Sequence, residues 1–230
     1  MDTPSPAPGP SPVADGSLGI GHLALHYGAA EDGPAAAHLL TAMGLTETQM
    51  LPLPGGNFYR FVTASHHYGR GDGIVYLSAL PEPQARLIAA IRSALRAGTS
   101  DEHEALVAYR AMMAQDYEAS FHVGFLIETL EELENLVLSL QELAESDPLL
   151  KGRISIGANR ARRGDPAVDA RLDASPVFGT VSREAYGRAG VQVFIETDLV
   201  RAGQLGESMV FEFDYVFPGH DSHILSIVEL

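Results

Sequence analysis

Apolar residues recur along the chain with two different spacings, which alternate from segment to segment. In some segments apolar and polar residues alternate roughly every two positions, a pattern typical of strands. In others the apolar residues recur three and four positions apart, which predicts amphipathic helices. Strands are expected at residues 18–27, 45–53, 58–63, 73–78, 120–128, 153–158, 191–198 and 208–217, and helices at residues 33–44, 81–98, 102–115 and from 129 onward.

Local signals mark the start of the helix in each half of the chain. Gly33 and Pro34 favour a helix start, and Gly44 favours the end of the same helix. Thr129 and Glu132 form the pattern of a capping box ahead of a leucine-rich stripe. Each of these helices directly follows a predicted strand.

The order of the predicted elements repeats. Residues 18–80 give a strand, a helix and three strands, and residues 118–230 give the same order again. Residues 81–117 form an inserted helical connection. Residues 159–190 are a loop too long for a simple connector, and residues 199–206 look like a further insertion. The sequence therefore predicts an α+β fold made of two β-α-β-β-β modules with inserted helices between them.

The first residues differ in composition from the rest. Residues 1–17 are rich in Pro, Ser and Gly and contain almost no large apolar side chain. Such a segment cannot bury enough surface to offset its chain entropy. A disordered tail is therefore expected here, ahead of the first module.

Composition narrows the classes of function. The chain has 230 residues, no Cys and a formal net charge of −15. The charge disfavours a nucleic-acid partner, because it repels phosphate backbones. No apolar run is long enough to cross a membrane, and the chain does not begin like a signal peptide. We therefore expect a cytoplasmic protein that acts on a small molecule, with no membrane partner, and a homodimer is one assembly that the pattern allows.

Two histidines occupy matching places in the two halves. His22 lies in the first strand of the first half, and His122 lies in the first strand of the second half. His26 is four residues after His22 and faces the same side of a regular strand, so it could replace His22. The absence of Cys means that any metal must be held by His and carboxylate groups. The histidines either meet at a metal ion or bond backbone groups on two separate strands.

The chain resembles the vicinal oxygen chelate superfamily, which includes glyoxalase I and the extradiol dioxygenases. The resemblance lies in Ile20-Gly21-His22-Leu23-Ala24-Leu25 and Phe121-His122-Val123-Gly124-Phe125, each followed by a helix. It covers roughly residues 18–80 and 118–217. It implies that each module curls into half of an open barrel, with a metal ion held between the halves.

The resemblance also implies a ligand set. His22 and His122 fall at first-strand ligand positions, Glu212 falls near the last-strand position, and Tyr76 falls at the fourth position. Two histidines and one carboxylate suit Fe(II) or Mn(II) best, with Zn and Ni also compatible. The function implied is a divalent-metal-dependent dioxygenase acting on a small oxygen-chelating, catechol-like substrate. Isomerase or lyase chemistry on the same scaffold stays open, and Glu196 competes with Glu212 as the carboxylate ligand.

Further candidates surround this expected site. His220 follows the last long strand and could act as a general acid or base. Tyr215 is a second catalytic candidate, although it shares a face with Glu212 only if the strand bulges. His66 and His67 lie in a Gly-rich loop that forms either a lip over the site or a solvated turn.

A basic cluster follows the sixth predicted strand. The segment Asn159-Arg160-Ala161-Arg162-Arg163-Gly164-Asp165 and the nearby Arg153 concentrate positive charge in an acidic protein. The arginines could receive an anionic substrate or pair with acidic side chains of the surface.

Two readings other than a metalloenzyme remain. The same barrel without a metal could bind or sequester a hydrophobic small molecule. Alternatively, the chain could be a ferredoxin-like α+β protein in which the repeats dimerise and the histidines are structural.

Overall fold

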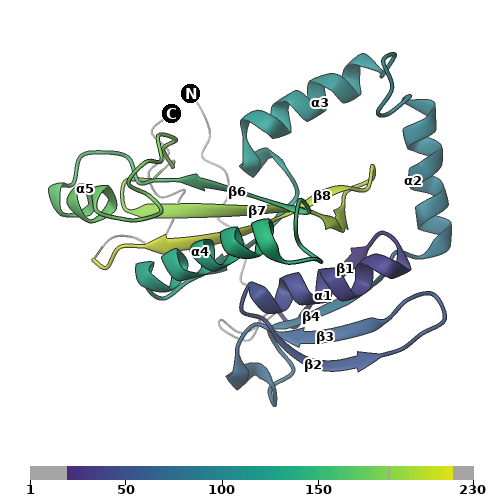
Figure 1. Cartoon of the computed structure of the whole chain (residues 1–230), viewed down its shortest axis with the longest axis horizontal. Coiled ribbons are helices and arrows are strands. Elements are labelled where there is room, and N and C mark those ends of the chain that lie inside the picture. The colour runs from purple at the N-terminus through teal and green to yellow at the C-terminus, as the bar shows by residue number, and fades with distance from the viewer. Residues whose placement is uncertain (1–19, 186, 220–230) are drawn as a thin grey trace, which may run out of the picture.

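The computed structural model describes residues 20–185 and 187–219. The predicted tail at residues 1–17 lies outside them. Within this part of the chain the fold is α+β, with five α-helices and eight strands in one mixed, open sheet (Figure 1). None of its helices is long and apolar enough to cross a membrane.

The element order follows the predicted repeat closely. The first half contains β1 (His22–Tyr27), α1 (Gly33–Ala42), β2 (Thr46–Leu51), β3 (Phe58–Val62) and β4 (Ile74–Ala79). The connection contains α2 (Glu82–Ala94) and α3 (Glu104–Gln115). The second half contains β5 (His122–Leu126), α4 (Leu130–Ser146), β6 (Ile154–Asn159), α5 (Pro166–Asp173), β7 (Gly190–Ala202) and β8 (Glu207–Val216).

The two halves pair their strands in the same order. In the first half β1 pairs with β4 in parallel, and β4, β3 and β2 then pair antiparallel. In the second half β5 pairs with β8 in parallel, and β8, β7 and β6 pair antiparallel. The halves join where the end of β7 pairs with β1, through His26 opposite Arg201 and Tyr27 opposite Val200. The predicted repeat is thus present in the hydrogen-bonded topology as well as in the element order.

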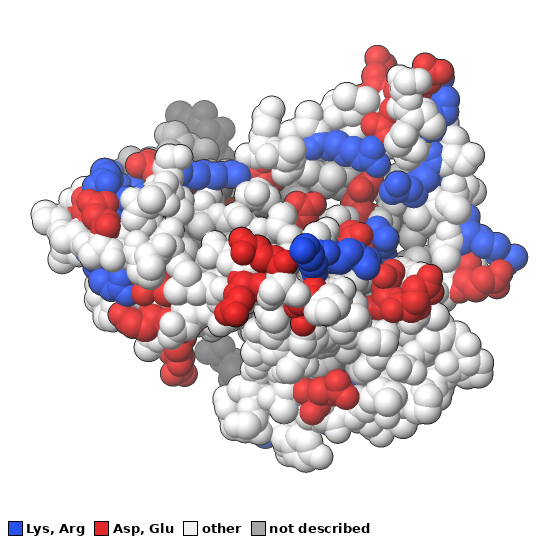
Figure 2. Space-filling model, viewed as in Figure 1, with Lys and Arg blue, Asp and Glu red and all other residues white. Residues whose placement is uncertain are grey.

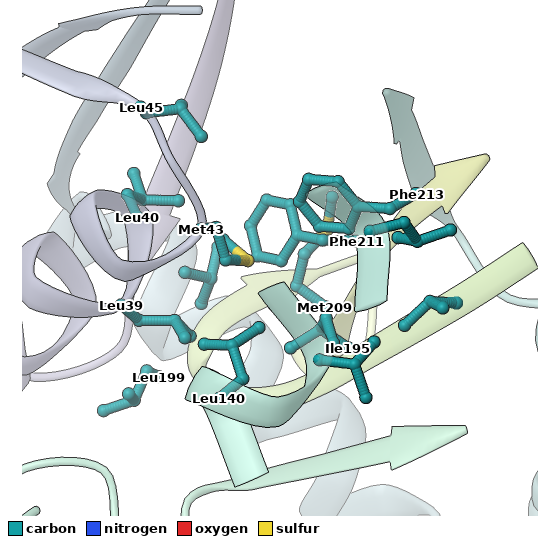
Figure 3. Packing of buried hydrophobic residues seen from close by; sticks show 14 of the residues in the cluster. Leu39, Leu40, Met43, Leu45, Leu140, Ile195, Leu199, Met209, Phe211 and Phe213 are labelled. Atoms are coloured by element: carbon teal, nitrogen blue, oxygen red, sulfur yellow. The ribbon is translucent and has the colours of Figure 1, made fainter. Parts of the chain in front are cut away.

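One hydrophobic core serves both halves. Figure 3 shows side chains of α1 beside Leu140 of α4 and the inner face of β8. Leu39, Leu40, Leu140 and Phe211 are buried almost completely. Burying a side chain of this size stabilises a fold by about 1.5–3 kcal/mol relative to leaving it in water. The shared core therefore fixes the two first-strand histidines relative to each other.

Side chains of β8 alternate between the core and a second, polar face. Phe211 and Phe213 point into the core, and Phe213 stacks on Phe125 of β5 at a ring distance of 5.2 Å. Glu212 and Asp214 alternate with these residues along the strand and face the opposite side. The two-residue period of a strand therefore brings both carboxyl groups to one face.

The inserted helices stand apart from the core. In Figure 1, α2 and α3 form an arch that leads from β4 to β5. No residue of α2 is buried, and α3 buries Leu106. Glu207 of β8 pairs with Arg110 of α3 at 3.5 Å and with Arg92 of α2 at 3.8 Å. These ion pairs hold both helices to the second half of the sheet.

Two sequence expectations differ from the structure. The loop at 159–190 contains α5, whose first turn is capped by Asp165 through bonds from Ala167 N at 2.9 Å and Val168 N at 3.1 Å. The apolar pattern is too short to reveal a helix of eight residues. The first half of the expected insertion at 199–206 is strand, because β7 runs through to Ala202 after a register shift, and the second half is the turn into β8.

Candidate functional site

A cavity of ≈ 650 Å³ opens between the starts of β1, β4 and β5. Its walls are mostly apolar and come from both halves of the chain. His22 and His122 both line it, as the matching positions of the two histidines suggested. The apolar part of the lining consists of Ile20, Leu23, Ile74, Val75, Phe121, Val123 and Phe125. Ile20 and Phe121 are largely exposed, so apolar surface is also presented outside the cavity.

His122 is held between two oxygen acceptors. Its Nδ1 donates to the carbonyl oxygen of Ser120 at 2.9 Å. Its Nε2 lies 3.2 Å from Oε2 of Glu212. The contact forms because β5 and β8 are parallel neighbours, with His122 beside Val210 and Gly124 beside Glu212. The structure thus brings together two of the three predicted metal ligands.

Glu212 is buried and belongs to a polar network. The side-chain amide of Gln192 donates to Oε1 of Glu212 at 2.6 Å and to Oε1 of Glu118 at 2.8 Å. The side-chain amide of Asn159 in turn donates to the side-chain oxygen, Oε1, of Gln192 at 3.1 Å. A buried charge needs such partners, because desolvation is costly. The network therefore fixes the orientation of the Glu212 carboxylate toward His122.

Asp214 adds a second carboxyl group beside Glu212. Burial, together with the neighbouring Glu212 charge, raises the pKa of Asp214 to about 8. The Asp214 carboxyl therefore keeps its proton at neutral pH. Gly124 faces both carboxyl groups, and a Cβ atom at this position would lie 4.0 Å from Oδ2 of Asp214 and from Oε2 of Glu212. Gly124 and His122 also line the cavity, so the carboxyl pair lies directly behind the cavity wall.

His22 lies on the opposite wall. Its ring packs against the ring of Tyr76, with a centroid distance of 5.3 Å. His26 is engaged elsewhere, because its Nδ1 lies 3.2 Å from the hydroxyl oxygen of Ser78. Tyr76, at the expected fourth ligand position, is therefore next to His22 and apart from the His122–Glu212 pair.

The donor set expected for a metal ion is only partly assembled. His122 and Glu212 have the arrangement of two ligands with outer partners, since each is oriented by a second hydrogen bond. In the described residues, no three His, Asp or Glu side chains are placed to hold one ion together. The pair fits a metal, and the set His22, His122 and Glu212 does not fit it as placed.

His67 and Asp72 form a second His–carboxylate pair at the cavity. His67 Nδ1 lies 2.9 Å from Oδ1 of Asp72, and both residues line the cavity. The sequence predicts that this Gly-rich segment is either a lip over the site or a solvated turn. Neither prediction pairs His67 with a carboxylate. An acid five residues after a His is too common a spacing to reveal this pair from sequence.

The remaining predicted residues lie elsewhere. Tyr215 faces the core, because β8 pairs with β7 without a bulge between Met209 and Val216. Glu196 lines a different cavity, beneath α3, together with Arg110. His220 lies outside the described residues. The structure therefore brings neither Tyr215 nor Glu196 to the His122–Glu212 pair.

The arginines of the basic cluster pair with carboxylates. Arg160 and Arg163 both bond Asp173 of α5, at 2.9 Å and 2.7 Å. Arg153 bonds Asp198 at 2.7 Å and Asp32 at 3.0 Å. Figure 2 shows the same interspersed pattern of acidic and basic side chains over one face of the molecule. For these three arginines the second reading, pairing with acidic side chains, is the one observed.

Comparisons with known proteins give only distant likenesses. No family model and no curated protein matches the chain. A solved structure described as a hydrolase, from Shewanella frigidimarina NCIMB 400, is 13% identical over 86% of this chain and 80% of that one, with a TM-score of 0.22. Another, described as a glyoxalase superfamily protein from Ralstonia eutropha JMP134, is 13% identical over 84% and 71%, with a TM-score of 0.21. These scores are too low to support a conclusion about activity.

Proposed function

We propose that the chain binds a small, largely apolar molecule in the cavity between β1, β4 and β5. The observation that carries this proposal is the cavity itself. It has a volume of ≈ 650 Å³, it is walled mostly by apolar side chains, and two histidines with carboxylate partners line it. A volume of 300–1,000 Å³ with a few convergent polar groups is typical of small-molecule sites.

The lining indicates the chemistry of the ligand. Leu23, Val75 and Val123 offer hydrocarbon surface to an aromatic or aliphatic body. A ligand that buries about 300 Å² of apolar surface gains about 7 kcal/mol from that burial, before the cost of association. His67, whose Nδ1 is held by Asp72, can bond one polar group of the ligand. The expected ligand is therefore a neutral ring or short chain with one hydrogen-bonding group.

A fluorescence titration with aminoanthracene tests this proposal. The probe is a neutral aromatic amine that brightens in apolar surroundings. Leu23→Trp should fill the cavity and weaken binding about tenfold or more, which corresponds to about 1.4 kcal/mol. Leu87→Trp is the matched control, because Leu87 is 56% exposed on α2. Equal affinity of wild type and Leu23→Trp, with both proteins folded by circular dichroism, would reject the cavity as the site.

A second function is favoured by the geometry of His122 and Glu212. We propose as the alternative a divalent-metal-dependent enzyme of the kind implied by the vicinal oxygen chelate resemblance, with the two modules as barrel halves. Such an enzyme would act on a catechol-like substrate as a dioxygenase, or as an isomerase or lyase. His122 and Glu212 would hold Fe(II) or Mn(II), which would bind two neighbouring substrate oxygens. Because His22 packs against Tyr76, we derive no reaction step through the metal.

Metal analysis separates the two functions. Wild type, His122→Ala and His66→Ala would be loaded with Fe(II), Mn(II), Zn(II) or Ni(II), dialysed and assayed for bound metal. About one equivalent in wild type and in His66→Ala, lost in His122→Ala, supports the metal-dependent enzyme. Protein that retains no metal under any of the four loadings rejects it and leaves the apolar binding function standing.

A further inference from the structure

Among the histidines that line the cavity, His67 is the one with Nδ1 held by a carboxylate and Nε2 left open. Its Nδ1 is engaged by Asp72 at 2.9 Å, whereas no protein atom in the described part of the chain bonds its Nε2. His122 differs, because both of its ring nitrogens face acceptor oxygens. A His whose Nδ1 is held by a carboxylate is the arrangement that orients a general base.

Asp72 sets the tautomer of His67. The hydrogen bond from His67 holds the pKa of the Asp72 carboxyl below its ordinary value, so this carboxyl is ionised at neutral pH. Arg70 also contacts Asp72, at 3.1 Å. An ionised carboxylate can only accept a hydrogen bond. The neutral His67 ring therefore keeps its proton on Nδ1 and has its lone pair on Nε2.

The loop fixes the His67 ring in place. Thr63 N donates to the carbonyl oxygen of Gly73 at 2.9 Å, which closes the loop at its base. Gly73 has a φ of +60°, and a Cβ atom there would lie 2.8 Å from Cγ of His67. The ring packs so closely against this residue that only glycine fits. The side chain of His67 is 23% exposed, so the base is partly withdrawn from water.

We propose that His67, oriented by Asp72, is a general base that removes a weakly acidic proton from the molecule bound in the apolar cavity. This inference rests on the proposed binding function, and it names the reaction class of the same site. In the proton transfer the Nε2 lone pair forms the new N–H bond. The electron pair of the broken C–H bond stays with the substrate and enters a double bond, and the displaced electrons move to an oxygen of the same molecule. No oxidant or other co-reactant is needed.

The apolar lining suits this chemistry. A neutral imidazole and a neutral substrate lose little hydration when they meet in the cavity, and an oriented base needs no rearrangement before it reacts. His122 and His22 line the same cavity. In neither of them does a carboxylate hold Nδ1 while Nε2 stays open, as in His67. The geometry therefore selects His67 from the histidines of the site.

5-Nitrobenzisoxazole is a suitable probe, because it is small, apolar and has one acidic C–H. A base removes that proton, the C–H electron pair completes a nitrile, the N–O bond breaks, and a coloured cyanonitrophenolate forms. Wild type should turn the probe over with saturation kinetics. His67→Gln should lower kcat about 100-fold with little change in KM.

Two further variants complete the test. Asp72→Asn should lower kcat about tenfold or more and alter its pH dependence, because the amide no longer fixes the Nδ1–H tautomer. His103→Gln is the matched control and should keep the wild-type kcat, since His103 is exposed at the start of α3 and does not line the cavity.

Binding and turnover separate the possible failures. Probe binding by equilibrium dialysis, together with a kcat that is the same in wild type, His67→Gln and His103→Gln, overturns the catalytic role while leaving the binding function intact. Absence of probe and aminoanthracene binding overturns the binding function, and the catalytic role falls with it.

Discussion

His122 Nε2 lies 3.2 Å from Glu212 Oε2, on two neighbouring parallel strands of the second half. The two residues are far apart in the chain, and two helices (α4 and α5) and two strands (β6 and β7) separate their strands. Their contact depends on the parallel pairing of β5 with β8, which places the first and last strands of the module side by side. The same pairing occurs between β1 and β4 in the first half.

His122→Ala should destabilise the fold. It would deprive the buried Glu212 of one partner and leave it with Gln192 and the neighbouring Asp214 carboxyl. We expect a loss of about 1–3 kcal/mol, because a buried charged group is deprived of a partner. His66→Ala should change stability by less than about 0.5 kcal/mol, as expected for an exposed residue. Urea unfolding at neutral pH measures both, and equal midpoints for the two variants would contradict a structural pairing of His122 with Glu212.

Asp214 should make the protein less stable as pH rises. Its folded-state pKa, about 8, is above the ordinary value of 3.8, so the folded state binds more protons than the unfolded state between these values. The protonated Asp214 therefore contributes its full share to the free energy of unfolding below about pH 4. This contribution is lost as pH rises toward 8. Asp214→Asn should remove this slope and gain on the order of a few kcal/mol over wild type near pH 8.

The comparison needs a control for the other titrating groups. Asp101→Asn removes an exposed carboxyl on the connection between the halves, and its unfolding free energy should follow wild type at every pH. Urea unfolding at half-unit steps from pH 4 to pH 9 gives all three curves. Parallel curves for wild type and Asp214→Asn would show that Asp214 is ionised in the folded protein.

Gly157→Ala should disturb the polar face of the second half. A Cβ atom at Gly157 would lie 2.6 Å from the ring of Tyr117, which is stacked on Phe194 with a centroid distance of 5.0 Å. We expect a loss of about 1–3 kcal/mol from overpacking and a change in near-ultraviolet circular dichroism. Gly55→Ala is the control, because nothing lies within 4 Å of its added Cβ. Wild-type stability of Gly157→Ala would mean that Tyr117 does not cover this strand.

Much of the fold could be predicted from sequence because its signals are local. The capping box at Thr129 is present, with Glu132 N donating to Thr129 Oγ1 at 3.2 Å. The strand periods located all eight strands, with boundaries a few residues off. α5 was missed because its burial rests on Val168 and Leu172, which are too few to define a period.

The site was harder to predict than the fold. The resemblance to the vicinal oxygen chelate superfamily implies that His122 and Glu212, on the first and last strands of one module, lie together, and the structure places their side chains 3.2 Å apart. His67 could not be predicted in this way, because its role depends on a loop that folds back on Gly73. Tyr215 was misleading for a related reason, since its direction depends on strand register, and a regular register turns it toward the core.

The position of a bound small molecule tests the central claim most directly. Nuclear Overhauser effects from aminoanthracene to assigned methyl groups of the protein would show where the probe lies. The account predicts contacts with the methyls of Leu23, Val75 and Val123, which line the cavity between the halves. Contacts confined to Met113 and Val210 beneath α3, or no contacts at saturating probe, would contradict it.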